Sequence, residues 1–315
     1  MVKDAAPGPR RKRTGKSSRR DRFLREKYLW LLLVPGIVWY LVFCYAPMYG
    51  LIISFKDFSP FKGIMKSPWV GFLWFKQFFQ SAFFWRLIRN TILLNVYGIL
   101  FAFPAPIILA LLLNEVRHRW FQRIAQTISY LPHFISMVIV VGMLVNFFDT
   151  QGIVNSFRHI FGLKSVNFMI QPGLFRPLYI GSGIWQSAGW NSIVYLAALA
   201  GIDQQLYEAA TVDGAGKIRQ LWHISLPGIL PTIVILLILN VGSMLNVGFE
   251  KVFLMYNPAT YETADVISTY VYRRGIASGE FSFGTAVGLF QAVINFALVV
   301  GANQLSKRVG EISLW

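Results

Sequence analysis

The chain has 315 residues, of which 55% are hydrophobic, 16% aromatic and 14% charged, and its formal net charge is +16. This composition excludes an ordinary soluble globular domain, and the single cysteine, Cys44, excludes an internal disulfide framework and a cysteine-based metal site. Six apolar runs, nearly free of charge, each have about the twenty residues that cross a bilayer as a helix. We therefore expect an all-α integral membrane protein with six transmembrane helices, at residues 28–54, 89–113, 125–148, 177–201, 229–249 and 284–305.

The first 27 residues differ in composition from the rest of the chain. They hold eleven of the thirty Lys and Arg against three acids, so half of the net charge lies there. This run has almost no apolar side chains to bury, which predicts a disordered or surface-lying arm. A basic run directly before a membrane helix favours cytoplasmic retention and attraction to anionic lipid over nucleic-acid binding. We therefore expect a basic cytoplasmic arm at 1–27 and a six-helix transmembrane domain at 28–315, with both termini inside.

The loops disagree with this orientation, because the segments expected outside hold more basic residues than the loops expected inside. The basic arm takes precedence, since the first charged flank usually dominates orientation. Among the outer segments, residues 55–88 are rich in Phe and Trp and include Lys76 and Arg86. Aromatic rings and cations at this density favour a helix anchored in the outer membrane interface.

The fourth and fifth apolar runs contain more polar and aromatic side chains than a lipid-facing helix needs. These are Trp185, Gln186, Trp190, Asn191, Tyr195, Asn240 and Asn246. Amides at membrane depth face protein or water, so they either join helices or line a polar pathway, and the sequence leaves both interpretations open. A sugar would suit such a pathway, because its C–H faces stack on rings and its hydroxyls bond to amides. Trp190 and Asn191 point about 100° apart on a helix, so not all seven can face one pathway.

The longest mixed polar segment between apolar runs is residues 204–227, which includes EAATVDGAGKIRQLWHISLP from Glu208 to Pro227. A helix-forming run ends at a turn that contains glycine, and apolar residues then recur at helical spacing with basic residues between them. Pro227 stands just before the next apolar run, which fits a helix that enters the membrane there. The pattern predicts a short helix–turn–helix at the membrane surface.

This segment resembles the EAA signature of importer permeases, the membrane subunits of binding-protein-dependent ABC transporters. The matching residues are Glu208, Ala209, Ala210, Asp213, Gly214, Ala215, Trp222, Ile224, Leu226 and Pro227. The resemblance implies the type I ABC importer permease fold, with residues 204–227 as the cytoplasmic coupling loop, whose coupling helix docks into a cleft on the ATPase. Trp222 stands where many relatives have Phe, so a large aromatic side chain is kept.

Three further stretches resemble the oligosaccharide and polysaccharide branch of these permeases more than other branches. They are PMYG in the first apolar run, LPHFIS in the third, and DTQGIVN after it. Permeases for alginate and pectin fragments are among the resemblances. His133 lies in the second stretch, and a lone histidine beside a proline near a helix start favours a structural hydrogen-bonding role over a pH switch.

Several kinds of functional group are not found in the sequence. No Asp, Glu, Lys or Arg lies well inside the six apolar runs, which argues against a stand-alone secondary carrier, because such carriers need an ionisable coupling site. A GxxxxGK[ST] phosphate loop, an HExxH motif and a plausible Ser–His–Asp grouping are also absent. The sequence therefore favours a translocation subunit over an enzyme.

The resemblance implies the rest of the assembly: a second, related permease subunit, two cytoplasmic ATPase subunits and an extracytoplasmic solute-binding protein. ATP and Mg²⁺ would bind to the ATPases, and this chain is expected to hold no cofactor or metal. Two copies of this chain in place of an unequal pair are an open alternative. An ABC importer permease for another solute and a stand-alone carrier are the alternative functions.

Basic residues in the outer segments favour an acidic oligosaccharide as the substrate. They are Lys56, Lys62, Lys66, Lys76, Arg158, Lys164, Lys251, Arg273 and Arg274. If these side chains face the outer vestibule, their field would attract anionic sugars such as alginate or pectin fragments. Contact with an acidic binding protein or with lipid explains the same residues equally well.

Overall fold

The computed structural model describes residues 27–310. This part of the chain is helical, and its one extended pairing is an isolated antiparallel bridge between Lys56 and Trp69. The described residues fall into two units, which divide between Ile52 and Ile53. The predicted basic arm lies outside the described residues, apart from Lys27.

The first unit is described from Lys27 onward, as a long apolar helix. It begins as α2 (Lys27–Tyr40), passes through a π-helical turn, η1 (Leu41–Tyr45), and continues as α3 (Ala46–Met48) and the 3₁₀ segment η2 (Tyr49–Phe55). No residue of α2, η1 or α3 is buried. An apolar helix with no buried face is suited to lipid or to another protein, not to water.

Five helices of the described chain are long and apolar enough to cross a membrane. They are Lys27–Phe55, Phe84–Asn114, Met137–Ile160, Lys217–Gly242 and Phe281–Arg308. A further helix, α11 (Pro172–Ala200), has 29 residues and carries the polar side chains noted in the fourth apolar run. The predicted all-helical membrane fold is confirmed, with five strongly apolar helices and one more polar helix of spanning length in place of six apolar ones.

The third predicted span, residues 125–148, is not one helix. It is divided among α8 (Arg119–Tyr130), a 3₁₀ turn, η4 (Leu131–Phe134), and α9 (Met137–Phe148). Pro132 has no amide proton to donate, and the Ser136 hydroxyl caps α9 by accepting a hydrogen bond from the Ile139 amide at 3.4 Å. A short helix, α10 (Ile153–Ile160), follows α9 after a break. The proline and the cap therefore place the start of this span later than the hydrophobic pattern predicted.

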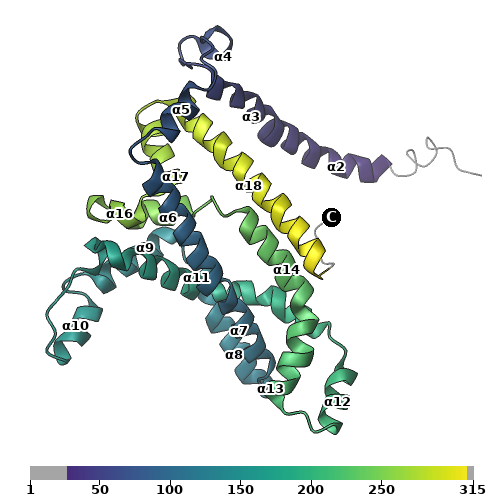
Figure 1. The fold of residues 1–315 in the computed structure, drawn as a ribbon. Helices are drawn as coiled ribbons and strands as arrows, with labels where there is room; N and C mark the ends of the chain where they lie inside the picture. The colour runs from purple at the N-terminus through teal and green to yellow at the C-terminus, as the bar shows by residue number, and fades with distance from the viewer. Residues whose placement is uncertain (1–26, 311–315) are drawn as a thin grey trace, which may run out of the picture. The chain divides into compact units, whose positions relative to one another are not determined.

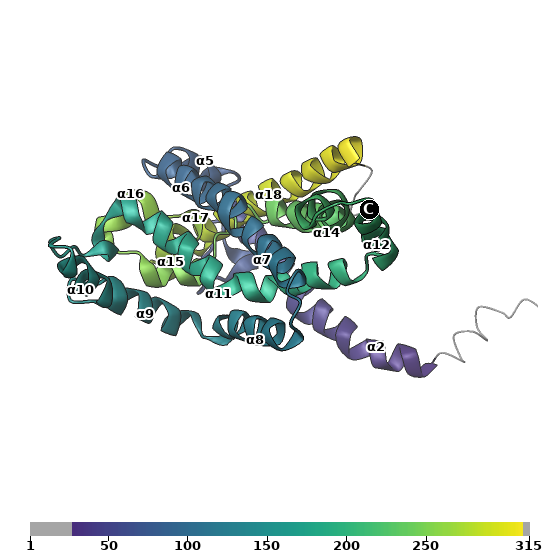
Figure 2. The ribbon, with the colours of Figure 1, turned by 90° about the horizontal axis from the view of Figure 1, so that it is seen from below.

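The second unit packs around α11. This helix lies between α7 (Pro104–Asn114) and α8, and it also contacts α14 (Leu226–Gly242) (Figure 2). α18 (Phe281–Gly310) runs beside α14 and reaches α5 (Leu73–Phe79) (Figure 1). α6 (Phe84–Tyr97) leads into α7 through a π-helical turn, η3 (Gly98–Ala102).

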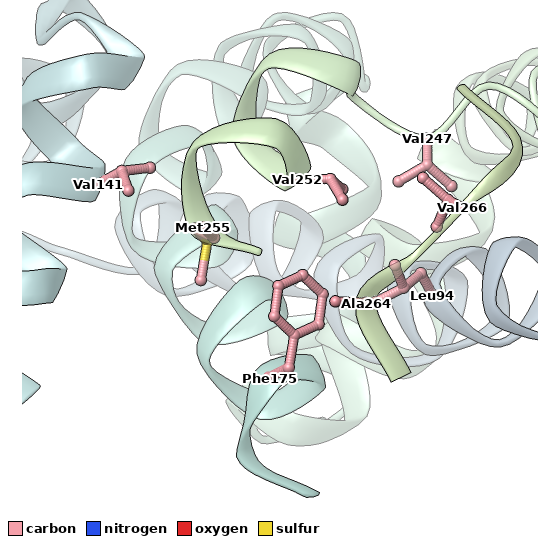
Figure 3. Packing of buried hydrophobic residues seen from close by; sticks show 8 residues of the cluster. All are labelled: Leu94, Val141, Phe175, Val247, Val252, Met255, Ala264 and Val266. Atoms are coloured by element: carbon pink, nitrogen blue, oxygen red, sulfur yellow. The ribbon is translucent and has the colours of Figure 1, made fainter. Parts of the chain in front are cut away.

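Buried apolar side chains hold α11 at both of its ends. Near its start, Phe175 belongs to a cluster from α6, α9, α15 (Phe249–Met255) and α16 (Tyr261–Ala264), which Figure 3 shows. The cluster consists of Leu94, Val141, Phe175, Val247, Val252, Met255, Ala264 and Val266. Near the other end of α11, Tyr195 and Leu199 pack with Ile107 and Ile229 from α7 and α14. The middle of α11 is left to the polar residues of the candidate site.

A buried ion cluster joins α6 to the segment that precedes α18. Asp265 is fully buried, and its Oδ2 accepts hydrogen bonds from Arg86 at 3.1 Å and Arg273 at 2.8 Å. Asn90 donates to the Asp265 carbonyl at 3.0 Å. Burial acts to lower the pKa of Arg273, but hydrogen bonds with Asp265 and Tyr256 outweigh it and raise that pKa. The carboxylate is thus matched by two cations, as a buried charge requires.

Candidate functional site

Residues 204–227 form the predicted helix–turn–helix. α12 (Gln204–Val212) starts after Asp203, whose Oδ1 accepts a hydrogen bond from the Gln205 amide at 2.9 Å. α13 (Lys217–Gln220) and a π-helical turn, η6 (Leu221–Ser225), then lead into α14. Figure 1 shows α12 and α13 at the opposite end of the second unit from α5 and α17 (Ile267–Val271).

Gly214 forms the turn between α12 and α13. Its φ is +76°, a left-handed conformation that favours glycine, as the sequence predicted. The Ala215 amide donates to the Ala210 carbonyl at 2.8 Å. Buried Gln220 donates through Nε2 to the Thr211 hydroxyl at 2.9 Å and to the Ala215 carbonyl at 3.1 Å. One side chain of α13 therefore bonds to both the end of α12 and the turn.

Two contacts connect this segment to the long helices. Lys217 Nζ lies 3.0 Å from Oε2 of Glu115, the residue that directly follows α7. The Tyr207 hydroxyl lies 2.9 Å from the hydroxyl of Ser225, which precedes α14. These two contacts join α12 and α13 to the ends of α7 and α14.

Three large apolar side chains are exposed on residues 204–227, which we call the coupling segment after the role that the sequence predicts. Val212, Ile218 and Trp222 have 87%, 77% and 60% of their surface exposed. Exposed Glu208 lines a cleft of about 500 Å³ with Lys217. Of the other residues matched to the signature, Ala209, Asp213, Gly214 and Pro227 are exposed, and Ala210, Ala215, Ile224 and Leu226 are half-buried. Large exposed apolar side chains in one short segment are typical of a docking surface.

A cavity of about 700 Å³ lies among α6, α7, α11, α14 and α15. Five of the seven residues expected on a polar pathway line it: Gln186, Asn191, Tyr195, Asn240 and Asn246. Gln186 also donates to the Ile135 carbonyl at 3.1 Å, so this amide both joins helices and lines the cavity. The side-chain amides of Asn191, Asn240 and Asn246 make no hydrogen bond within the described chain, which leaves them free to bind a ligand.

The two tryptophans of the predicted pathway do not line the cavity. Trp185 lines a separate apolar pocket of about 340 Å³ between α9 and α11. Trp190 stacks on His133, with ring centroids 4.6 Å apart and planes 1° apart, and His133 lines the cavity. Ring stacking thus takes the place of the hydrogen bond expected for His133. Successive helical residues turn by about 100°, so Gln186 and Asn191 face the cavity and the tryptophans beside them do not.

Residues 102–311 match the family model of the binding-protein-dependent transport system inner membrane component. The chain belongs to this family. Protein LplB of Bacillus subtilis (strain 168) is 48% identical to this permease over 92% of each chain. The polygalacturonan/rhamnogalacturonan transport system permease protein YteP of the same strain is 45% identical, over 93% of this chain and 92% of its own.

A solved structure has the same fold. A chain in the crystal structure of a bacterial ABC transporter involved in the import of the acidic polysaccharide alginate matches this permease with a TM-score of 0.86 and 46% identity. The match covers 92% of this chain and 99% of that one. The predicted family and the predicted resemblance to permeases for alginate and pectin fragments are both confirmed.

The wall of the permease cavity also includes a lysine, Lys251, that was not predicted there from the sequence. Lys251 lines the cavity and is only 5% exposed. Its Nζ donates to the Tyr179 carbonyl at 2.8 Å and lies 4.7 Å from the centroid of the Tyr179 ring. From the sequence, Lys251 is expected among the basic residues of the outer segments. The local sequence signal of its burial is that the apolar stretch VFLM, residues 252–255, follows it directly.

The Lys251 side chain reaches the cavity because the helix of the fifth predicted span, residues 229–249, is interrupted. α14 ends at Gly242, and residues 243–248 are not helical. Two amides of α18 stabilise this segment: Asn295 accepts from the Leu245 amide, and Gln291 donates to the Leu245 carbonyl, both at 3.0 Å. Non-helical backbone in a membrane domain is tolerated where protein satisfies it or where it lines a cavity. Both conditions hold here, since Asn246 lines the cavity.

Several of the outer basic residues already have partners. Arg273 and Arg274 form ion pairs with Asp265 and Glu280, the second at 2.7 Å. Lys56 donates to a backbone carbonyl at 2.8 Å. Cations that are paired with acids contribute less to a long-range field. The hypothesis of an electropositive outer vestibule therefore rests on fewer unpaired cations than the nine basic residues named from the sequence.

Proposed function

We propose that this permease carries oligosaccharides across the membrane, as one of the two permease subunits of an ATP-driven importer. The observation that carries this proposal is the free side-chain amides of Asn191, Asn240 and Asn246 on the wall of a cavity of about 700 Å³. A side-chain amide both donates and accepts hydrogen bonds, which suits the hydroxyls of a sugar. The relatives named for polygalacturonan and for alginate support a sugar substrate, including an acidic one.

The driving reaction takes place on separate ATPase subunits in this proposal, and ATP and Mg²⁺ bind there. The exposed apolar surface around Val212, Ile218 and Trp222 docks into each ATPase cleft. Movement of the cleft passes through α13 to the end of α7 and through η6 to α14. Both helices line the cavity, so ATP binding changes the shape of the sugar pathway.

The proposal includes an orientation in the membrane. In it α12 and α13 face the cytoplasm, both termini lie on that side as the sequence predicts, and the solute-binding protein delivers sugar at the opposite face. A bacterial alginate ABC transporter with a chain 45% identical to this one was crystallised in complex with an alginate pentasaccharide-bound periplasmic protein. That complex supports the presence of a binding protein, and a second, related permease subunit completes the pathway.

Co-purification and reconstitution test this function. The chain is expressed with the products of its neighbouring genes, purified through a tag on the permease, and reconstituted in proteoliposomes. We expect an ATPase and a second permease to co-purify, and binding protein loaded with an oligosaccharide to stimulate ATP hydrolysis and uptake. Failure to recover an ATPase would contradict the assembly. Stimulation by non-sugar solutes alone would contradict the substrate class.

A further inference from the structure

The charge on the cavity wall is unbalanced. Among the described residues that line the cavity, Lys251 is the one with a full charge by type, and there is no Asp or Glu. Four ion pairs form in the described part of the chain, and none of them involves Lys251. A buried ammonium group without an anion is unfavourable, so a charge kept in this position calls for a ligand that supplies the missing anion.

The geometry directs the ammonium group of Lys251 along the cavity wall. Its Nζ lies above one turn of α11, where it bonds to the Tyr179 carbonyl at 2.8 Å. A Cβ added at Gly183 would stand 3.2 Å from Nζ, so the glycine leaves room for the ammonium group. An ammonium has three protons to donate, and Lys251 makes this one hydrogen bond within the described chain. Two protons are available to a ligand.

The same face of α11 presents further polar groups. Tyr179, Gly183, Gln186 and Ser187 all line the cavity, at the helical spacing that puts residues on one side of a helix. The ammonium group of Lys251 therefore stands on the same side of α11 as an amide and a hydroxyl, each of which donates one hydrogen bond to a backbone carbonyl and keeps an oxygen that can accept one. This order of groups matches a sugar that has both hydroxyls and a carboxylate.

We propose that Lys251 is an anion-binding residue of the translocation cavity, which binds a carboxylate of the passing oligosaccharide and makes the permease itself selective for acidic sugars. This inference rests on the proposed function in oligosaccharide import. It places charge selection inside the membrane domain, in addition to any selection by the binding protein. A charge-assisted hydrogen bond to the carboxylate replaces the counter-ion that the cavity wall does not provide.

The test compares a charged sugar with an uncharged one of the same length. The complete importer is reconstituted with its binding protein, and uptake of trigalacturonate and of its methyl ester is measured with saturating amounts of loaded binding protein. Variants Lys251→Gln and Lys251→Arg remove and keep the charge. Lys56→Gln is the matched control, because Lys56 also donates to a backbone carbonyl at 2.8 Å but does not line the cavity.

We expect Lys251→Gln to lower trigalacturonate uptake by about tenfold or more, the factor that one hydrogen bond to a charged group supplies, and to leave uptake of the ester unchanged. Lys251→Arg and Lys56→Gln should transport both sugars as the wild type does. Equal losses for both sugars would overturn the inference in favour of a packing role. Unchanged trigalacturonate uptake in Lys251→Gln, or a loss in Lys251→Arg equal to that in Lys251→Gln, would overturn it too.

A second measurement does not depend on the binding protein. Equilibrium dialysis of the solubilised importer should show tighter binding of trigalacturonate than of its ester, and Lys251→Gln should remove the difference. Equal binding of the two sugars by the wild type would contradict the inference but leave the proposed function standing. A wild-type importer that shows no ATP-dependent uptake of any oligosaccharide, charged or uncharged, would contradict the proposed function itself, and the inference with it.

Discussion

Lys217 and Glu115 form an ion pair that joins α13 to the end of α7, with Nζ and Oε2 3.0 Å apart. The two side chains are 64% and 29% exposed, so solvent screens the pair and its contribution to stability is about 0.5 kcal/mol. Its importance is positional. It connects the coupling segment to a cavity-lining helix that the segment does not reach through the adjacent chain.

Reversing one charge of this pair should weaken coupling without unfolding the permease. We expect Glu115→Lys to lower sugar-stimulated ATPase activity by about twofold, because an attraction of this size becomes a repulsion. The double variant Glu115→Lys with Lys217→Glu should restore the activity. Melting temperature and basal ATPase activity serve as controls. A double variant no better than the single one would show that the pair does not transmit motion.

The turn at Gly214 should tolerate no side chain, whereas Gly216 two positions later should. The φ of Gly214 is +76° and that of Gly216 is −69°, and an added Cβ would meet no atom within 4 Å at either position. The two alanine variants therefore differ in backbone strain alone, about 1 to 2 kcal/mol at Gly214. We expect Gly214→Ala to reduce stimulated ATPase activity and Gly216→Ala to preserve it.

Gly214→Asp should insert normally and lose stimulation altogether, since it adds both strain and a charge to the docking surface. Membrane insertion and the basal ATPase activity of the assembled complex are the controls. Full stimulation in Gly214→Asp would mean that the segment is only a connector between helices.

The free amides of the cavity should contribute to transport more than to folding. We expect Asn240→Ala and Asn246→Ala to lower sugar uptake while sparing basal ATPase activity, because each amide lines the cavity and makes no hydrogen bond elsewhere in the described chain. Trp185→Leu is the control, since Trp185 lines a different, apolar pocket. Loss of expression in the asparagine variants would instead identify these amides as contacts between helices.

The buried carboxylate of Asp265 should be the most sensitive position for stability. Asp265→Asn leaves Arg86 and Arg273 without their shared anion, and breaking a buried pair in this way costs about 3 kcal/mol or more. We expect a clear fall in the melting temperature of the purified permease. The matched variant Glu280→Gln removes the half-exposed partner of Arg274 and should change stability by less than about 1 kcal/mol.

The coupling segment could be predicted from sequence because its signals are local. Helix-forming residues before Gly214, amphipathic spacing after it and Pro227 at the start of the next helix all lie in one short stretch. The long apolar helices could be predicted for a similar reason, since length and composition are properties of each run alone. The break at Pro132 and Ser136 shows the limit of that approach, because hydrophobicity continues across it.

The cavity wall could be predicted only in part. The polar character of Gln186 and Asn191 is visible in the sequence, but the face of α11 that meets the cavity is fixed by packing against α7, α8 and α14. Lys251 could not be placed, because its position depends on where α14 ends. That end is stabilised by Gln291 and Asn295, which are some 46 and 50 residues away from Leu245 along the chain.

The end of α14 at Gly242 divides the fifth membrane segment into a helical part and a non-helical part. If the coupling segment moves as proposed, α14 carries the displacement along its 17 residues, about 25 Å, to the non-helical residues 243–248. We expect the displacement to change the conformation of these residues, which the hydrogen bonds of α18 to Leu245 fix to a second helix. In the proposed mechanism the ATPases would therefore change the cavity wall around the sugar, and the part of the permease beyond residues 243–248 would move less.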